Sequence, residues 1–276
     1  MRRITASKLM SLSGWFFRPG KTRFVVATRW AFTAFSSLIA LSFNGTTQAV
    51  MMATPADLED FGVGFAVTEG IASPQEILSV EVEPVPRGLD VQIWLHPEAE
   101  ARLSSRRRTM SGPVGCGLCG IDSIEQALRE VPVVAPSAFR MSPSQVLAAV
   151  AALPGEQRLH DATRAVHGAA FWNGRVLLAR EDVGRHNALD KLVGGMASQG
   201  IAPQGAVVLT SRVSTDMVQK VAMLGAPMII AVSAPTAEAV ELAERAGITL
   251  IALARGDRFE VFSHTDRLKM EQAHVG

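Results

Sequence analysis

Residues 206–254 read AVVLTSRVSTDMVQKVAMLGAPMIIAVSAPTAEAVELAERAGITLIALA, and this stretch decides the fold class. Three nearly continuous apolar runs have the length and the β-branched content of buried strands, and they span residues 206–211, 228–233 and 248–254. Two segments between them repeat apolar residues at helical spacing, and they span residues 214–224 and 236–246. Buried strands that alternate with helices predict a parallel or mixed sheet covered by helices on both faces.

The same alternation begins upstream, after about residue 160. Apolar runs at residues 165–172 and 175–181 flank Asn173-Gly174, a dipeptide that is typical of a β-hairpin turn. A helix is expected to follow over residues 186–197, and an edge strand over residues 259–263. The second half of the chain therefore predicts one α/β unit.

The first part of the chain has a different pattern, which predicts a smaller α+β unit. Its runs with strand patterning lie at residues 38–43, 46–52, 77–85 and 89–95. The first two flank Asn44-Gly45 and predict a hairpin. Thr54-Pro55 predicts the start of a helix that runs to Glu69, because threonine is a good N-cap and proline suits the first turn.

Composition and charge exclude several classes of protein. The 276 residues are 48% hydrophobic and 19% charged, which excludes a disordered or collagen-like chain. A net charge of +1 offers no general attraction to nucleic acid or to an anionic membrane. The basic N-terminus precedes an uncharged run at residues 30–43, an order that is also found in secretory signals. Arg29 interrupts the apolar stretch, however, and the run is shorter than the roughly 20 residues that a membrane span needs. We therefore expect a cytoplasmic protein in which residues 1–36 form a mobile tail.

Polar side chains gather where the predicted strands pass into the next element. They are Glu181, Asp182, Gly184, Arg185, His186, Ser211, Arg212, Ser233 and residues 255–258. Open α/β sheets bind ligands at the carboxyl ends of their strands, and helix N-termini there favour anions. The set predicts a site for a phosphate-bearing ligand, although each turn taken singly is also what ordinary helix capping produces.

The segment Gly115-Cys116-Gly117-Leu118-Cys119-Gly120 contains both cysteines of the chain. Its glycines allow a bulky partner to approach the sulfur, because no Cβ blocks the way. Asp122 is expected to cap a helix over residues 123–129, and a helix N-terminus stabilises a nearby thiolate. Structural zinc would need two more ligands, and no histidine pair has ligand spacing, so we expect no metal. A CxxC pair alone still leaves open a sulfur-carrying nucleophile and a dithiol–disulfide switch.

In five segments the chain resembles the FdhD family of formate dehydrogenase accessory sulfurtransferases. The segments are FNGTTQAVMMATPADLEDFGVGFAVTEGI (residues 43–71), GPVGCGLCGI (112–121), EDVGRHNALDK (181–191), TSRVSTDMVQK (210–220) and AVSAPTAEAVELAERAGITLIALARGDRFEVFSH (231–264). The sequence AFTAFSSLIAL at residues 31–41 departs from the family, which usually has an acidic segment before its first strand.

The resemblance implies a fold and an activity. The fold is a small N-terminal α+β lobe at residues 37–108 and a three-layer αβα lobe at residues 109–276, cytidine-deaminase-like but without zinc. The activity is sulfur transfer: the protein accepts sulfur from a cysteine desulfurase as a persulfide. It then passes the sulfur to the molybdenum bis(molybdopterin guanine dinucleotide) cofactor before the cofactor is inserted into formate dehydrogenase.

The resemblance also assigns residues. Cys116 matches the persulfide carrier and Cys119 the second family cysteine, and the cofactor-binding stretch matches Leu253, Ala254, Arg255, Gly256, Asp257 and Arg258. We expect the guanine nucleotide of the cofactor to bind there, and we expect a homodimer because a bulky two-pterin ligand suits a site enlarged by a second subunit. Two other classes stay open, namely a dithiol–disulfide oxidoreductase that uses both thiols and a noncatalytic pterin-cofactor chaperone that uses neither.

Overall fold

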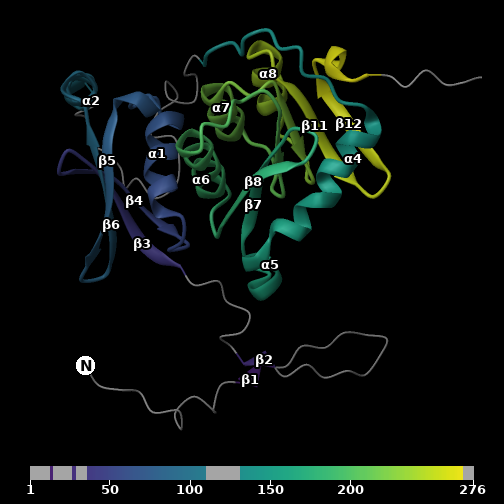
Figure 1. Cartoon of the computed structure of the whole chain (residues 1–276). Coiled ribbons are helices and arrows are strands. Elements are labelled where there is room, and N and C mark those ends of the chain that lie inside the picture. Colours follow the sequence, from purple (N-terminus) through teal and green to yellow (C-terminus); the bar gives the residue numbers. More distant parts are fainter. Residues whose placement is uncertain (1–12, 15–26, 29–35, 110–130, 270–276) are drawn as a thin grey trace, which may run out of the picture.

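The structure is a computed structural model that describes residues 13–14, 27–28, 36–109 and 131–269 (Figure 1). Cys116, Cys119 and the helix predicted over residues 123–129 lie outside the described residues, as does most of the predicted tail. Two short strands at the N-terminus, β1 (Ser13–Gly14) and β2 (Ala27–Thr28), pair in antiparallel fashion. No helix in the described ranges is long and apolar enough to cross a bilayer.

The larger sheet has six strands in the order β12-β11-β10-β9-β7-β8. The strands are β7 (His167–Trp172), β8 (Val176–Asp182), β9 (Ala206–Leu209), β10 (Met228–Ala231), β11 (Thr249–Arg255) and β12 (Arg258–Ser263). Strands β9, β10 and β11 are parallel, whereas β7 is antiparallel to both of its neighbours and β12 is antiparallel to β11. The predicted mixed sheet is confirmed.

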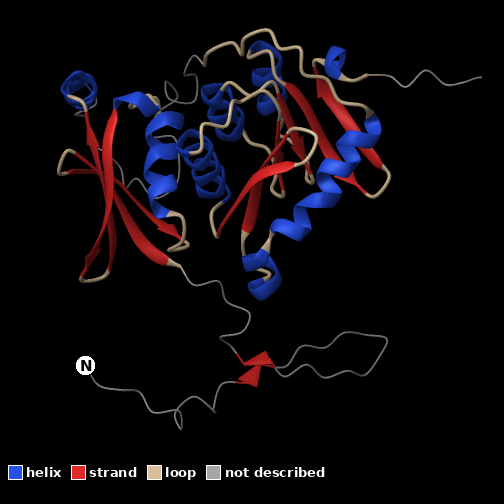
Figure 2. Ribbon diagram, viewed as in Figure 1, coloured by secondary structure: helices blue, strands red, loops and turns tan. Residues whose placement is uncertain are grey.

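Helices cover both faces of this sheet (Figures 1 and 2). The helices on one face are α6 (Arg185–Ser198), α7 (Thr215–Leu224) and α8 (Ala237–Arg245). Helix α4 (Pro143–Ala152) lies on the other face. It is followed in the chain by η3 (Leu153–Glu156) and α5 (Arg158–Thr163), and η4 (Thr265–Arg267) follows β12. Along β9, Val207 and Leu209 enter the core beneath α6 to α8, whereas Ala206 and Val208 enter the core beneath α4. Both faces are buried, which explains why the strand is apolar at every position.

The smaller sheet has four strands in the order β4-β3-β6-β5. The strands are β3 (Ser37–Phe43), β4 (Thr46–Ala53), β5 (Ile77–Val85) and β6 (Gly88–Leu95), and the helices around them are α1 (Leu58–Thr68), η2 (Pro74–Glu76) and α2 (Pro97–Thr109). Strands β3 and β6 are parallel and the other pairs antiparallel, so this sheet is also mixed. The predicted turn is confirmed: Asn44 and Gly45 have φ of 47° and 77°, as a type I′ hairpin turn requires.

Helix α1 starts later than the sequence predicted. Asp57, with φ of 52°, occupies the N-cap position, and Thr54 does not cap the helix. The N–H of Thr54 instead donates to Asp182 Oδ2 at 2.9 Å, and its Oγ1 accepts from the N–H of Val183 at 3.2 Å. The predicted cap was wrong because residues 128 and 129 positions away use the hydrogen-bonding groups of Thr54.

The two sheets are joined through helices, with α1 standing between the smaller sheet and α6 (Figure 1). A Cβ added at Gly64 of α1 would overlap the carbonyl oxygen of Asp190, and one added at Gly194 of α6 would overlap the carbonyl oxygen of Asp60. The two helices therefore touch backbone to backbone, an approach that only glycine permits at these positions.

Candidate functional site

Four strands of the larger sheet end at one edge. Strands β9, β10 and β11 are mutually parallel, and β8 runs in the same direction because β8 and β9 are both antiparallel to β7. This edge carries the polar turns that the sequence singled out, namely residues 181–186, 211–212, 233 and 255–258. Their predicted convergence on one edge is confirmed, and the edge is where ligands of open α/β sheets bind.

The end of β11 has an unusual backbone. Leu253 has φ of 54°, and the register between β11 and β12 shifts between Ala252 and Arg255. The N–H of Leu253 donates to the carbonyl of Ser233 at 3.3 Å, and Arg255 Nε donates to the carbonyl of Val232 at 3.0 Å. A left-handed backbone is uncommon for a bulky residue and persists only where the surrounding structure holds it. The segment with the predicted cofactor-binding residues is therefore shaped by the loop that follows β10.

Three guanidinium groups are exposed at this edge, those of Arg212, Arg255 and Arg258. Their planar donors suit bidentate bonding to phosphate. Helices α7 and α8 begin just after β9 and β10 at the same edge, so their first N–H groups add a preference for anions. Asp257 is also exposed in the turn between β11 and β12 and supplies a carboxylate there.

At the other half of the edge, a basic cluster is formed by His160, His167, Arg185 and His186. His186 Nε2 lies 3.1 Å from Asp216 Oδ2 in α7, and the interaction with His186 holds the pKa of that carboxyl below its usual range. Burial lowers the pKa of His167, and the charges of Arg185, His160 and His186 lower it further. The half-buried His167 is therefore predominantly neutral near pH 7.

Two buried lysines of the larger lobe bind the smaller lobe beside this edge. Lys191 Nζ donates to Asp182 Oδ2 at 2.6 Å and to the carbonyl of Thr54 at 2.8 Å. Lys220 Nζ donates to Asp190 Oδ2 at 3.1 Å, and it also donates to Thr68 Oγ1 at 3.0 Å and Glu69 Oε1 at 2.8 Å. Although burial lowers the pKa of the Lys220 ammonium, the charges of Asp190 and Glu69 raise it above its usual value. Both motifs, residues 181–191 and 210–220, thus hold the lobes together.

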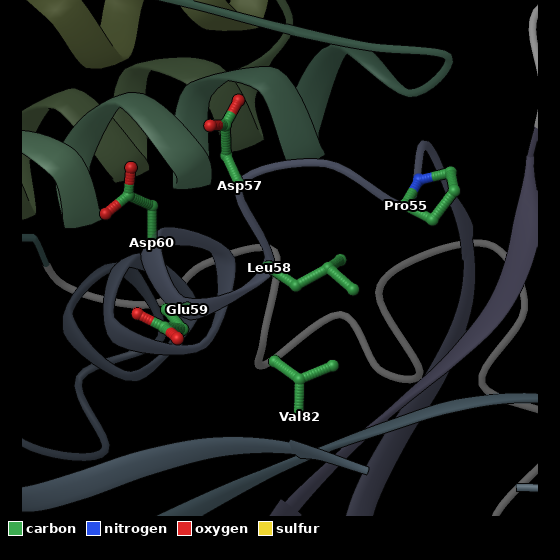
Figure 3. A pocket seen from close by; sticks show the side chains of 6 residues that line it. All are labelled: Pro55, Asp57, Leu58, Glu59, Asp60 and Val82. Atoms are coloured by element: carbon green, nitrogen blue, oxygen red, sulfur yellow. The ribbon is translucent and has the colours of Figure 1, made fainter. Parts of the chain in front are cut away.

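A cavity of about 360 Å³ lies elsewhere, at the start of α1 (Figure 3). Its walls are formed by Pro55, Asp57, Leu58, Glu59, Asp60 and Val82. The carboxylates of Asp57 and Asp60 point toward the neighbouring helix, and Arg180 lies 3.7 Å from the first and 2.6 Å from the second. None of residues 211–212, 233 and 255–258 lines this cavity, so it is not the predicted nucleotide site.

Comparison with known proteins agrees with the resemblance seen in the sequence. The FdhD/NarQ family model matches residues 36–269. The chain belongs to the FdhD/NarQ family. Sulfur carrier protein FdhD of Agrobacterium fabrum is 55% identical over 234 residues, covering 83% of this chain and 86% of that protein. Sulfur carrier protein FdhD of Bordetella petrii is 46% identical over 236 residues, covering 84% of each.

A solved structure has the same overall arrangement. The crystal structure of a protein from Desulfotalea psychrophila, described as a formate dehydrogenase accessory protein, superposes with a TM-score of 0.71 at 26% identity. The superposition covers 94% of this chain and 98% of that chain. The FdhD/NarQ match begins at residue 36, next to the start of β3, so residues 31–35 of the segment that departs from the family precede it and residues 36–41 lie within it.

Within this FdhD/NarQ chain, the structure brings only part of the predicted site together. Residues 253–258 lie at the sheet edge, whereas Cys116 and Cys119 lie outside the described residues, and their roles stay predictions. Among the described residues, no group of three or more His, Cys, Asp or Glu side chains could hold a metal ion. Cys116 and Cys119 lie outside these residues, so the expected lack of zinc also stays a prediction.

Three residues at this edge were not predicted from the sequence as site residues, namely His160, His167 and Asp216. They lie on α5, on β7 and in the first turn of α7, and only the folded sheet brings them near His186. A weak signal was present in the sequence, because His167 lies near the start of the strand predicted over residues 165–172 and Asp216 closely follows the strand predicted over residues 206–211.

Proposed function

We propose that this chain is a sulfur carrier that matures formate dehydrogenase. It would take sulfur from a cysteine desulfurase onto Cys116 and transfer it to the molybdenum bis(molybdopterin guanine dinucleotide) cofactor, which is its substrate, before the cofactor enters the dehydrogenase. The observation that carries the proposal is the family match, which spans both cysteines, with relatives at 46–55% identity that are named sulfur carrier protein FdhD.

The loading step follows from thiol chemistry. The Cys116 thiolate attacks the outer sulfur of the donor persulfide, and a new S–S bond forms on Cys116. The S–S bond of the donor breaks and its cysteine leaves as a thiolate, so the exchange needs no external oxidant or reductant. Gly115 and Gly117 favour this attack because they leave the approach to the sulfur open.

The sheet edge supports the second half of the proposal. Arg212, Arg255 and Arg258 suit the phosphates of the guanine nucleotide, and the loops at Ser211 and Ser233 border the same place. The proposal also includes a cytidine-deaminase-like fold for the lobe at residues 109–276 beside the small lobe at residues 37–108, a cytoplasmic location and a homodimer.

Mass spectrometry after incubation with a desulfurase and cysteine tests the proposal. We expect one added sulfur atom on the peptide that contains Cys116, and none in Cys116→Ser. That variant should fail to restore formate dehydrogenase activity, whereas Cys119→Ser should still load sulfur on Cys116.

The same variants separate the rival functions. A dithiol–disulfide oxidoreductase would lose its activity with either cysteine, and it would carry an intramolecular disulfide in place of the added sulfur. A noncatalytic cofactor chaperone would mature the dehydrogenase fully as Cys116→Ser. Full maturation by the serine variant therefore overturns the sulfur-transfer proposal.

A further inference from the structure

We propose that the basic cluster of His160, His167, Arg185 and His186 is a second anion subsite, which binds a phosphate-class oxyanion of the ligand whose nucleotide lies at β10 and β11. The identity of that ligand rests on the proposed function. The subsite itself rests on the arrangement of the side chains at the carboxyl end of β8.

Three elements converge at the cluster. His167 opens β7 directly opposite Asp182, the last residue of β8, and α6 starts three residues after Asp182 with Arg185 and His186. His160, on α5, lies beside them, because its Nδ1 is 3.2 Å from the carbonyl oxygen of Val166. The four side chains thus come from α5, β7 and α6 to one end of the sheet.

The neighbouring carboxylates are already engaged. Asp182 is fully buried and accepts from Lys191 Nζ, and its oxygens also bond the N–H groups of Thr54 and Gly184. The two oxygens of Glu181 accept from the backbone N–H groups of residues 159 and 160. Of the described carboxylates, Asp216 alone pairs with a side chain of the cluster. The cluster therefore contains more basic side chains than the neighbouring described carboxylates pair with.

Arg185 has a donor that lacks a partner. Its Nε is shielded from solvent and makes no hydrogen bond to any described residue. Shielded donors in folded proteins are nearly always bonded, since an unmade bond there is costly. Gly184 at the N-cap has no side chain to cap α6, and the first turn of this 14-residue helix carries no acid. An oxyanion would accept from Arg185 and from the first N–H groups of α6 at once.

The spacing indicates a second subsite and not an extension of the first. In the strand order β8-β7-β9-β10-β11, the ends of β8 and β11 are four steps apart. Strands lie about 4.8 Å apart, so the cluster and Arg255 are separated by roughly 19 Å. Two cationic groups at that separation favour a ligand with anionic groups at both ends, such as a dinucleotide cofactor.

Binding at the cluster should take up a proton. His167 is neutral at neutral pH because burial and its basic neighbours disfavour its charged form. A bound dianion favours the charged form, so it should raise the pKa of His167. The groups that face His167 are Arg185 and His186 from α6, His160 from α5 and Asp182 from β8, with Asp216 behind His186. Affinity for an anion of constant charge should therefore fall as pH rises.

The experiment follows the histidine ring signals by NMR during titration with sulfate, which stays a dianion between about pH 5 and pH 8, the range in which histidines titrate. The signals of His167 and His186 should shift, and the pKa of His167 should rise. His264 is the internal control: its backbone carbonyl bonds Thr249 at the start of β11, the opposite edge of the sheet.

A matched pair of variants tests whether the Arg185 side chain binds the anion. Arg185→Gln should weaken sulfate binding roughly ten- to hundred-fold, the usual loss for one charge-assisted bond. Arg175→Gln is the control, because Arg175 is exposed at the hairpin that joins the other ends of β7 and β8, and it should bind like the parent. The unchanged signal of His264 in each variant verifies that the fold is retained.

A second titration, with GDP present at saturation, distinguishes the two subsites. Sulfate should still bind the cluster, because the nucleotide lies at the other end of the edge. Three results would each overturn the second subsite, even if GDP binds as proposed. They are displacement of sulfate from the cluster by GDP, shifts of the His264 signal as large as those of His167, and sulfate binding by Arg185→Gln that equals that of the parent. Sulfate binding without any GDP binding would keep the anion site and overturn the nucleotide part of the proposed function.

Discussion

The ammonium group of Lys191 lies 2.6 Å from the carboxylate of Asp182, and neither side chain has any exposed surface. The same ammonium group bonds the carbonyl of Thr54 and lies 5.7 Å from the centroid of the Phe61 ring, both in the smaller lobe. Lys191 therefore connects α6, β8 and the two lobes at one buried point.

Removing this ammonium group should destabilise the protein strongly. In Lys191→Met the carboxylate of Asp182 stays buried without its charge partner, a change that typically costs about 3–5 kcal/mol. Urea unfolding followed by circular dichroism measures the loss. Lys269→Met is the control, since Lys269 is exposed and its replacement should change stability by about 0.5 kcal/mol or less. A loss under about 1 kcal/mol in Lys191→Met would contradict the interpretation.

The contact between α1 and α6 predicts that Gly64 tolerates no side chain. Gly64→Ala would push a methyl group into the backbone of residue 190, and such overpacking costs about 1–3 kcal/mol or more. Gly155→Ala is the matched control, because a Cβ there meets no atom within 4 Å. The melting temperature of Gly64→Ala should be lower than that of Gly155→Ala. Equal melting temperatures would show that the two helices are not packed backbone to backbone.

His167 predicts a pH dependence of stability. Its pKa in the folded protein is below the ordinary value of 6.5, so the unfolded chain binds the proton more readily. Stability should then fall as pH drops through about 6.5, because unfolding takes up a proton in that range. His167→Gln should flatten this part of the curve. Urea midpoints measured between about pH 5 and pH 8 test the difference, and identical slopes in parent and variant would refute it.

The half of the sheet edge that carries Arg212, Arg255 and Arg258 predicts GDP binding. GDP should raise the melting temperature by mass action, and Arg258→Ala should weaken its binding about ten- to hundred-fold. Arg245→Ala is the control, because Arg245 is exposed at the end of α8, near the opposite edge of the sheet. Calorimetry gives both affinities. If the parent shows no heat, or if Arg258→Ala binds as well as the parent, the nucleotide lies elsewhere.

Local sequence was sufficient for most of the elements. The runs before and after Asn173-Gly174 became β7 and β8, and the apolar runs in residues 206–254 became β9, β10 and β11. Their common carboxyl edge followed from the alternation of strands and helices, because parallel strands end on the same side of a sheet. The position of residues 253–258 at that edge could therefore be predicted from local pattern alone.

The contacts between the lobes could not be predicted in the same way. Thr54 has the features of a helix cap, yet its groups bond Asp182 and Val183, while Lys220 bonds Thr68 across 152 positions of the chain. The basic cluster shows the same limit, since the partner of His186 is Asp216 on another helix. The spacing of apolar residues predicts which side of a helix or strand is buried, because that spacing is a property of each segment by itself. Which buried polar groups meet depends on how α1 packs on α6 and α7, and only the tertiary structure decides that packing.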